Sequence, residues 1–177
     1  MTTATPDAIT AFLDEHAIKS VAHRFARGLD RMDRNLIESC FHEDGTDDHG
    51  MFKGSAKDFC DWVMPQLEIY DATQHVISTQ NVEIRDKKAV CESYFYARHA
   101  LKMDGTPKEL VAAGRYVDTL EKRDGVWKIT HRHAVFDWNR LVDDMAIPSR
   151  PDVEDLMTYG QQGSGDASYD AFAALKA

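Results

Sequence analysis

A chain of 177 residues and 20.0 kDa is long enough for a single domain with a core of its own, and its 43% of hydrophobic residues is ordinary for a soluble globular protein. The formal net charge of −9 argues against a nucleic-acid partner, which would need clustered Lys and Arg. No apolar run is long enough to span a bilayer, and the N-terminal segment lacks the basic and apolar regions of a secretory signal, so we expect a cytoplasmic protein with no membrane partner.

Three helices are predicted in the first part of the chain. Apolar residues recur at helical spacing from Pro6 to Leu29, and a short second helix over 33–41 has Asp33 as its N-cap. Ser55 caps a third helix over 55–70, which Pro65 should kink or shorten. The residues expected to face the core are Ile9, Phe12, Leu13, Ile18, Val21, Ala22, Phe25 and Leu29, then Leu36, Ile37, Cys40 and Phe41, and finally Phe59, Trp62, Val63 and Leu67.

The pattern changes after Asp71 to the spacing of β-strands. Turn residues divide it into long strands over 73–84, 88–103, 109–123 and 125–138, and the turn-rich stretch 42–54 has room for one short strand. Helices followed by an antiparallel meander indicate an α+β fold. The helices would cover the concave face of a long curved sheet and so enclose a cone-shaped pocket.

From about Asn139 the strand pattern decays. We therefore expect one domain over residues 1–139 and an extension over 140–177 that packs on the domain or on a neighbouring subunit. Cys40, Cys60 and Cys91 are far apart in apolar patterns, which favours reduced core thiols over a cysteine nucleophile. Motifs for phosphate binding, dinucleotide binding, paired-cysteine zinc sites and the serine nucleophile elbow do not occur in the sequence, so nucleotide cofactors and serine hydrolysis are not the first hypotheses.

Asp30 is a carboxylate placed where the first helix enters the core. It could simply end the helix at the surface, or it could point into the pocket and orient a base. His75, at the start of the first long strand, titrates near neutrality and can exchange a proton. If Asp30 reaches one ring nitrogen of His75, the carboxylate fixes the tautomer and stabilises the imidazolium. The alternative is that His75 is a solvent-exposed histidine at a strand edge.

From Ala8 to Trp138 the layout resembles the SnoaL-like branch of the NTF2-like (cystatin-like cone) superfamily. The similarity rests on the segments RGLDRMDRNLIESCFHEDG, FKG, QHVISTQNVEI and LEKRDGVWKI. The chain is closest in pattern to cofactor-independent lyases of the γ-hexachlorocyclohexane dehydrochlorinase, bile-acid dehydratase and scytalone dehydratase type. The resemblance implies an NTF2-like cone-shaped α+β barrel, no cofactor, and a catalytic Asp30–His75 dyad assisted by Arg132. Phe25 stands where bile-acid dehydratases carry a tyrosine.

Further residues are candidates for substrate binding. Asp48 and His49 lie near the expected mouth of the cone, where a solvated acidic turn is the alternative. Tyr94 and Tyr96 share one strand face, which could present hydroxyl groups to a substrate or pack with the hydroxyl tips in water. By strand alternation, Arg132 shares a face with Phe136 and Trp138, opposite His131 and His133. The complete list of expected substrate-binding residues is Asp48, His49, Tyr96, Phe25 and Trp138. A metal site made from His99, His131 and His133 is a weaker alternative, so no metal ligand is predicted.

The leading hypothesis is a cofactor-independent lyase that removes a proton from a hydrophobic small molecule, expected to be aromatic, and eliminates water, halide or a small aldehyde. An isomerase or hydrolase on the same scaffold is one alternative. A non-catalytic ligand-binding or structural subunit, like the small subunit of ring-hydroxylating dioxygenases, is another. Because exposed outer sheet faces are usually covered, we also expect a homo-oligomer, either a trimer or a dimer.

Overall fold

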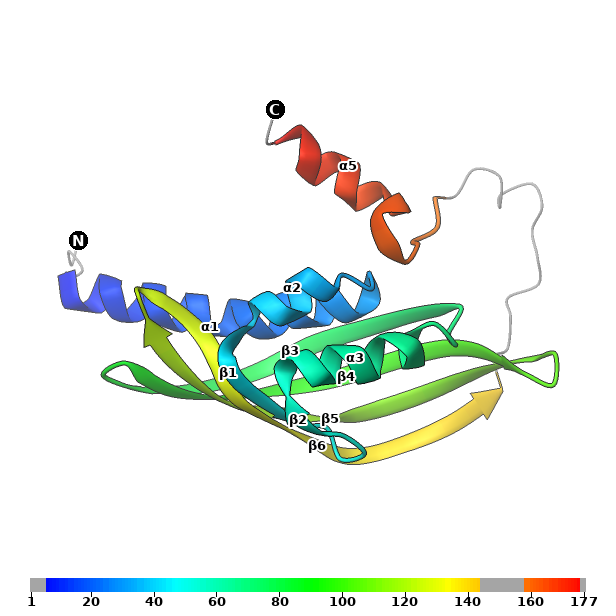
Figure 1. Cartoon of the computed structure of the whole chain (residues 1–177), viewed down its shortest axis with the longest axis horizontal. Coiled ribbons are helices and arrows are strands. Elements are labelled where there is room, and N and C mark those ends of the chain that lie inside the picture. The colour runs from blue at the N-terminus through cyan, green and yellow to red at the C-terminus, as the bar shows by residue number, and fades with distance from the viewer. Residues whose placement is uncertain (1–5, 144–157, 176–177) are drawn as a thin grey trace.

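A computed structural model describes residues 6–143 and 158–175 of the chain. The elements are α1 (Pro6–Asp30), α2 (Arg34–Ser39), β1 (Phe41–Asp48), β2 (Lys53–Ser55), α3 (Ala56–Leu67), β3 (Ala72–Arg85), β4 (Lys88–Met103), β5 (Thr106–Arg123), β6 (Val126–Asp143), the 3-10 turn η1 (Gly163–Gly165) and α5 (Ala167–Ala174). Figure 1 shows α1, α2 and α3 over one face of a curved sheet, with α5 beyond α1 and α2. The predicted α+β cone fold is confirmed.

The helices cover the sheet with the predicted apolar stripes. In α1 the residues Ile18, Val21, Phe25 and Leu29 are buried at intervals of three and four, as one face of a helix requires. The first turns of α1 differ from the prediction, because Ile9, Phe12 and Leu13 are exposed among the described residues. No helix in the ranges 6–143 and 158–175 is long and apolar enough to cross a membrane.

Both predicted helix caps are present. The Asp33 side chain accepts the Leu36 backbone N–H, and the Ser55 side chain accepts that of Asp58, which satisfies donors at each helix start. Helix α3 ends at Leu67 rather than at residue 70, and Pro65 lies in its last turn. The shortening fits the missing N–H of proline.

The sheet has six strands in the order β2-β1-β6-β5-β4-β3. The meander β3–β6 was predicted, and its hairpins turn at Asp86, Asp104 and Asp124, each with a positive φ of 50–55° that suits a tight two-residue hairpin. Strand β1 pairs in parallel with β6, and β2 pairs in antiparallel fashion with β1. The turn-rich stretch therefore holds two strands where one was expected.

Register shifts in the meander help to decide which side chains face the helices. In the β3–β4 pair the ladder shifts between Ile77 and Gln80. In the β5–β6 pair Gly114 lies opposite Phe136 and Ala113 opposite Trp138, so Asp137 is an extra residue in a bulge. A Cβ on Gly114 would come within 2.1 Å of the Val135 carbonyl oxygen, which explains the glycine.

The chain beyond residue 139 does not leave the domain at once. Strand β6 continues to Asp143, and its last residues pair with β5, so the predicted boundary cuts through a strand. Residues 144–157 lie outside the described residues. Residues 158–175 pack on this domain, where the Tyr169 hydroxyl donates to Asp33 and the Arg27 guanidinium lies 5.1 Å from the Tyr169 ring centroid.

Candidate active site

A cavity of about 510 Å³ lies between α3 and the inner face of the sheet. Its walls are mainly apolar and aromatic, and the polar side chains that line it come from separate elements. These polar lining residues are His49, Gln66, Tyr70, His75, His99, Tyr116 and Asn139. A mostly apolar cavity with a few convergent polar groups is typical of a small-molecule site.

Asp30 and His75 are hydrogen-bonded at this cavity. The ring Nδ1 of His75 lies 2.7 Å from Asp30 Oδ1, and only 6% of the His75 side chain and 13% of the Asp30 side chain are exposed. The backbone N–H of His75 donates to Asp30 Oδ2 at 2.9 Å, and the Thr73 hydroxyl donates to Oδ1 at 3.0 Å. Because an ionised carboxylate only accepts, Nδ1 carries the proton and Nε2 is the basic nitrogen. The expected contact between Asp30 and His75 is therefore present in the structure.

His99 is a cavity residue that sequence analysis considered only as a metal ligand. Its ring meets that of His75 edge to face, with centroids 5.3 Å apart, and its Nδ1 lies 3.3 Å from the Leu110 carbonyl oxygen. Burial, and next the charge of His75, lower the pKa of His99 to about 4. His99 is therefore a neutral imidazole at physiological pH.

His49 lines the same cavity and contacts the carboxylate of Asp47, whereas Asp48, the other residue expected at the mouth, does not line the cavity. His49 Nδ1 lies 3.1 Å from Asp47 Oδ1, and the Asp47 side chain is fully buried. Asp48 points the other way and forms an ion pair with Lys53 at 2.8 Å. Strand alternation gives the reason, since residues 47 and 49 share one face while 48 takes the opposite face. The spacing Asp-x-His in the sequence could have predicted that Asp47 and His49 lie on the same face.

Arg132 faces inward, as predicted, but it does not line the cavity. It is fully buried and makes two hydrogen bonds of 2.7 Å to Asp118. Its guanidinium carbon lies 3.9 Å from the ring centroid of Phe25 and 4.2 Å from that of Tyr116. Burial is the largest single influence and would lower the pKa of Arg132, but the charge and hydrogen bonds of Asp118, with the nearby Tyr116 and Asp47, together raise that pKa. The expected direct catalytic contact is therefore not supported by this position.

Besides Asp48, three further residues expected to bind substrate do not line the cavity. Phe25 is buried in the core beneath the cavity, against Phe41, Phe59 and Tyr116. Tyr96 and Trp138 lie on the outer face of the sheet, with ring centroids 6.1 Å apart. Tyr96 faces outward because its neighbours Phe95 and Ala97 are buried. Trp138 faces outward because the bulge at Asp137 separates its face from that of Phe136, which does line the cavity.

The remaining alternatives from the sequence do not form a site. His131 and His133 lie on the exposed outer face while His99 lines the cavity, so these three imidazoles cannot share a metal ion. Within residues 6–143 and 158–175, no group of three or more His, Cys, Asp or Glu side chains is placed to hold one. All three cysteines are free and buried, as predicted, and burial raises the pKa of each thiol, to about 12 for Cys60.

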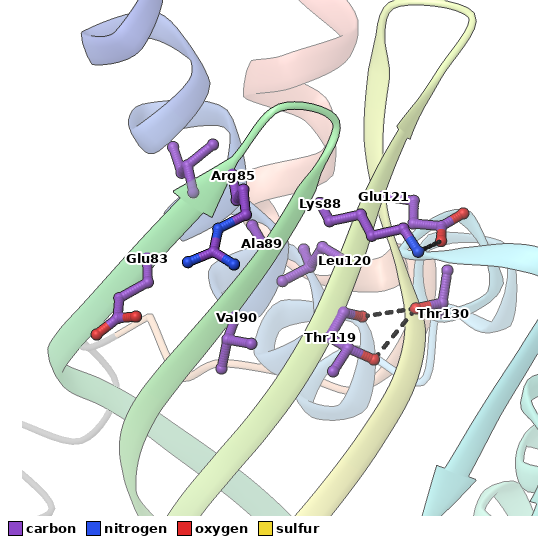
Figure 2. Close-up of a pocket in the computed structure, with 10 residues that line it drawn as sticks. Glu83, Arg85, Lys88, Ala89, Val90, Thr119, Leu120, Glu121 and Thr130 are labelled. Atoms are coloured by element: carbon purple, nitrogen blue, oxygen red, sulfur yellow. Dashed lines mark hydrogen bonds and ion pairs between the residues drawn. The ribbon is translucent and has the colours of Figure 1, made fainter.

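A second hollow of about 480 Å³ lies at the hairpin ends of β3 and β4 (Figure 2). Figure 2 shows its side chains, which include an ion pair of 3.7 Å between Lys88 and Glu121 and hydrogen bonds between Thr119 and Thr130. The described residues that line it include no histidine. The cavity lined by His49, His75 and His99 is therefore the candidate active site.

The fold and the cavity define a class of small α+β cone proteins with a pocket between helices and sheet. The chain belongs to the SnoaL-like domain family, whose model matches residues 10–133. Solved structures with the same fold include hexachlorocyclohexane dehydrochlorinase LinA-type3 from Novosphingobium barchaimii, with a TM-score of 0.68 and 17% identity over 80% of this chain and 99% of that one. A protein from Novosphingobium aromaticivorans that is provisionally named a scytalone dehydratase has a TM-score of 0.65 and 19% identity over 79% of this chain and 98% of that one.

A third structure, the Kfla4162 protein from Kribbella flavida, has a TM-score of 0.67 and 18% identity over 73% of this chain and 95% of that one. No curated protein matches the sequence. These structural likenesses show the fold.

Proposed function

We propose that this chain is a cofactor-independent lyase that removes a proton from carbon in a hydrophobic small molecule and eliminates a small group. The observation that carries the proposal is the Asp30–His75 hydrogen bond of 2.7 Å at the wall of an apolar cavity. A carboxylate that holds one ring nitrogen of a histidine, and so leaves the other free to act as a base, is a recurring arrangement in catalysis. The dehydrochlorinase neighbours have the same fold, which is consistent with this proposal.

In the proposed reaction, His75 Nε2 takes the proton. Asp30 holds the opposite ring nitrogen and stabilises the imidazolium that forms, and it is itself held by Thr73 and by the His75 backbone. General base catalysis of this kind contributes about 10²–10⁴-fold. The apolar walls would exclude water and position the substrate, which supplies the rest of the acceleration.

Aromatic ketones that differ only at the β carbon test this proposal. Propiophenone has an acidic C–H and no leaving group, so exchange of its α hydrogen for deuterium in D₂O reports the base alone. β-Hydroxypropiophenone and β-chloropropiophenone add a leaving group to the same skeleton. We expect the wild-type chain to accelerate exchange and elimination above the buffer rate, and we expect His75→Gln to lose about 10²-fold or more in both.

His131→Gln is the matched control, because it removes an exposed histidine from the outer face of the sheet. Exchange and elimination at the buffer rate with the wild-type chain would contradict the proposal, as would full activity in His75→Gln. Catalysed exchange without any elimination would favour an isomerase instead.

A further inference from the structure

The cavity contains a second histidine–carboxylate pair, which the reaction proposed above does not yet use. Asp47 lies at the end of β1 and His49 just after that strand, while His75 lies on β3. In the sheet order these strands are separated by β6, β5 and β4, so the two imidazoles reach the cavity from different walls. A substrate in the cavity can therefore have one imidazole on each side.

The two carboxylates differ in the donors that they receive. Asp30 accepts from the Thr73 hydroxyl and the His75 backbone N–H as well as from the His75 ring. Asp47 Oδ1 accepts a hydrogen bond from the His49 ring, whereas Asp47 Oδ2 is buried without a hydrogen-bond partner among the described residues. A buried carboxylate without neutral donors is costly unless a cation compensates its charge.

The buried guanidinium of Arg132 is already committed to another carboxylate. It is paired through two hydrogen bonds with Asp118, although its Nη1 has no partner within the described part of the chain and its charge is felt by Asp47. The single positive charge of Arg132 thus lies near two buried carboxylates, those of Asp118 and Asp47. The group hydrogen-bonded to Asp47 is the His49 ring, and a carboxylate in this position stabilises the protonated form of the ring.

The surroundings of His49 suit a group that carries a proton toward a substrate. Its ring packs among aromatic side chains from α3, β5 and β6, with centroids 5.1 Å from Phe59, 6.1 Å from Tyr116 and 5.8 Å from Phe136. Only 15% of the His49 side chain is exposed. With Nδ1 held by Asp47, Nε2 is the nitrogen left to donate into the cavity.

We infer that His49, held by Asp47, is the proton donor to an oxygen leaving group, so that the substrate of this site is a hydrophobic alcohol that loses water. The inference rests on the lyase function proposed above. His75 Nε2 takes the proton from carbon, the C–H electron pair forms the double bond, and the C–O bond breaks. The departing hydroxyl takes the proton from His49 Nε2 and leaves as water. His75 then holds a proton and His49 lacks one, and exchange with solvent restores both.

The leaving group distinguishes this role from a structural one. Hydroxide is a poor leaving group and needs a proton, whereas chloride leaves as the anion. We expect His49→Gln to lower dehydration of β-hydroxypropiophenone by about 10²–10⁴-fold. Its elimination of chloride from β-chloropropiophenone and its deuterium exchange with propiophenone should change by less than about tenfold, because the base is intact.

Asp47→Asn is the second variant, because it keeps the size of the side chain and the His49 ring while removing the charge. It should show the same split between hydroxyl and chloride substrates, and His131→Gln should show none. Near-UV circular dichroism would confirm the fold of each variant. Equal losses on the hydroxyl and chloride substrates, or unchanged dehydration, would overturn the inference. If the wild-type chain does not accelerate deuterium exchange into propiophenone, the proposed base His75 is wrong instead.

Discussion

Asp30 binds His75 at two points, through the ring Nδ1 at 2.7 Å and through the backbone N–H at 2.9 Å. The carboxylate therefore fixes both the strand position of His75 and the orientation of its imidazole. A single side chain at the end of α1 thus ties the first helix to the first strand of the meander.

Replacing Asp30 by Asn tests this double contact. The amide nitrogen of Asn would favour the tautomer with the proton on Nε2, so the base would be lost while the shape is kept. We expect Asp30→Asn to lower deuterium exchange into propiophenone by about 10²–10⁴-fold. Thr73→Val keeps the carboxylate and removes only one donor, so its loss should be at most about tenfold. Wild-type exchange rates in Asp30→Asn would exclude the dyad.

Arg132 should matter for stability more than for contact with substrate. Removing the guanidinium leaves the buried carboxylate of Asp118 without its partner and removes a nearby positive charge from Asp47. We expect Arg132→Met to lower the free energy of unfolding by about 3–5 kcal/mol in urea denaturation. Arg132→Met combined with Asp118→Leu should recover part of that loss, because one stranded charge is removed. Wild-type stability in the single variant would contradict this picture.

His99 should make the folded state sensitive to acid. The ordinary pKa of a histidine, 6.5, applies to His99 in the unfolded chain, and the pKa falls to about 4 in the folded chain. Between these two pH values the unfolded chain therefore binds a proton that the folded chain does not. Its contribution to stability is complete above about pH 6.5 and declines as the pH falls toward about 4, by about 3 kcal/mol in all. The comparison is the pH dependence of urea unfolding in the wild type and in His99→Gln. The variant should lack this part of the acid loss, and parallel curves would contradict the assignment.

Gly114 should tolerate no side chain. An alanine Cβ would lie 2.1 Å from the Val135 carbonyl oxygen and 3.0 Å from Phe95 Cζ, and neither the strand nor the core can easily yield. We expect Gly114→Ala to lower the free energy of unfolding by about 2–4 kcal/mol. Gly160→Ala is the control, since its nearest neighbour would be 3.6 Å away, in ordinary contact. Equal urea midpoints for the two variants would contradict this prediction, because they would show that β5 and β6 can move apart at the bulge to accommodate the methyl group.

Local patterns predicted most of the elements. The alternation in β4, where Cys91, Ser93, Phe95 and Ala97 are buried, and the helical spacing in α1 depend on neighbours in sequence. The pairing of Asp30 with His75 came from resemblance to a family and from their places at element ends. The parallel pairing of β1 with β6 could not be predicted, because it joins segments far apart in the chain with no local turn between them.

Register shifts were not predicted, and the one in β6 explains the wrong position expected for Trp138. Arg85 pairs with Lys88, and a regular ladder from that turn would place His75 opposite Arg98, whereas it lies opposite Ala97. If the bulge in β6 is ignored, the alternation of side chains along the strand places Trp138 on the inner face together with Phe136. Such shifts depend on how strands pack against the helices, which short sequence patterns do not encode.

The bulge at Asp137 also sets what the cavity can admit. With Asp137 extruded, the small amide of Asn139 lines the cavity and the indole of Trp138 does not. Movement of the bulge by one position along β6 would exchange the two, so an insertion or deletion there could remodel the chamber without altering any catalytic group. The size of the cavity thus depends on the absence of a side chain at Gly114, which allows β5 and β6 to lie close together at the bulge.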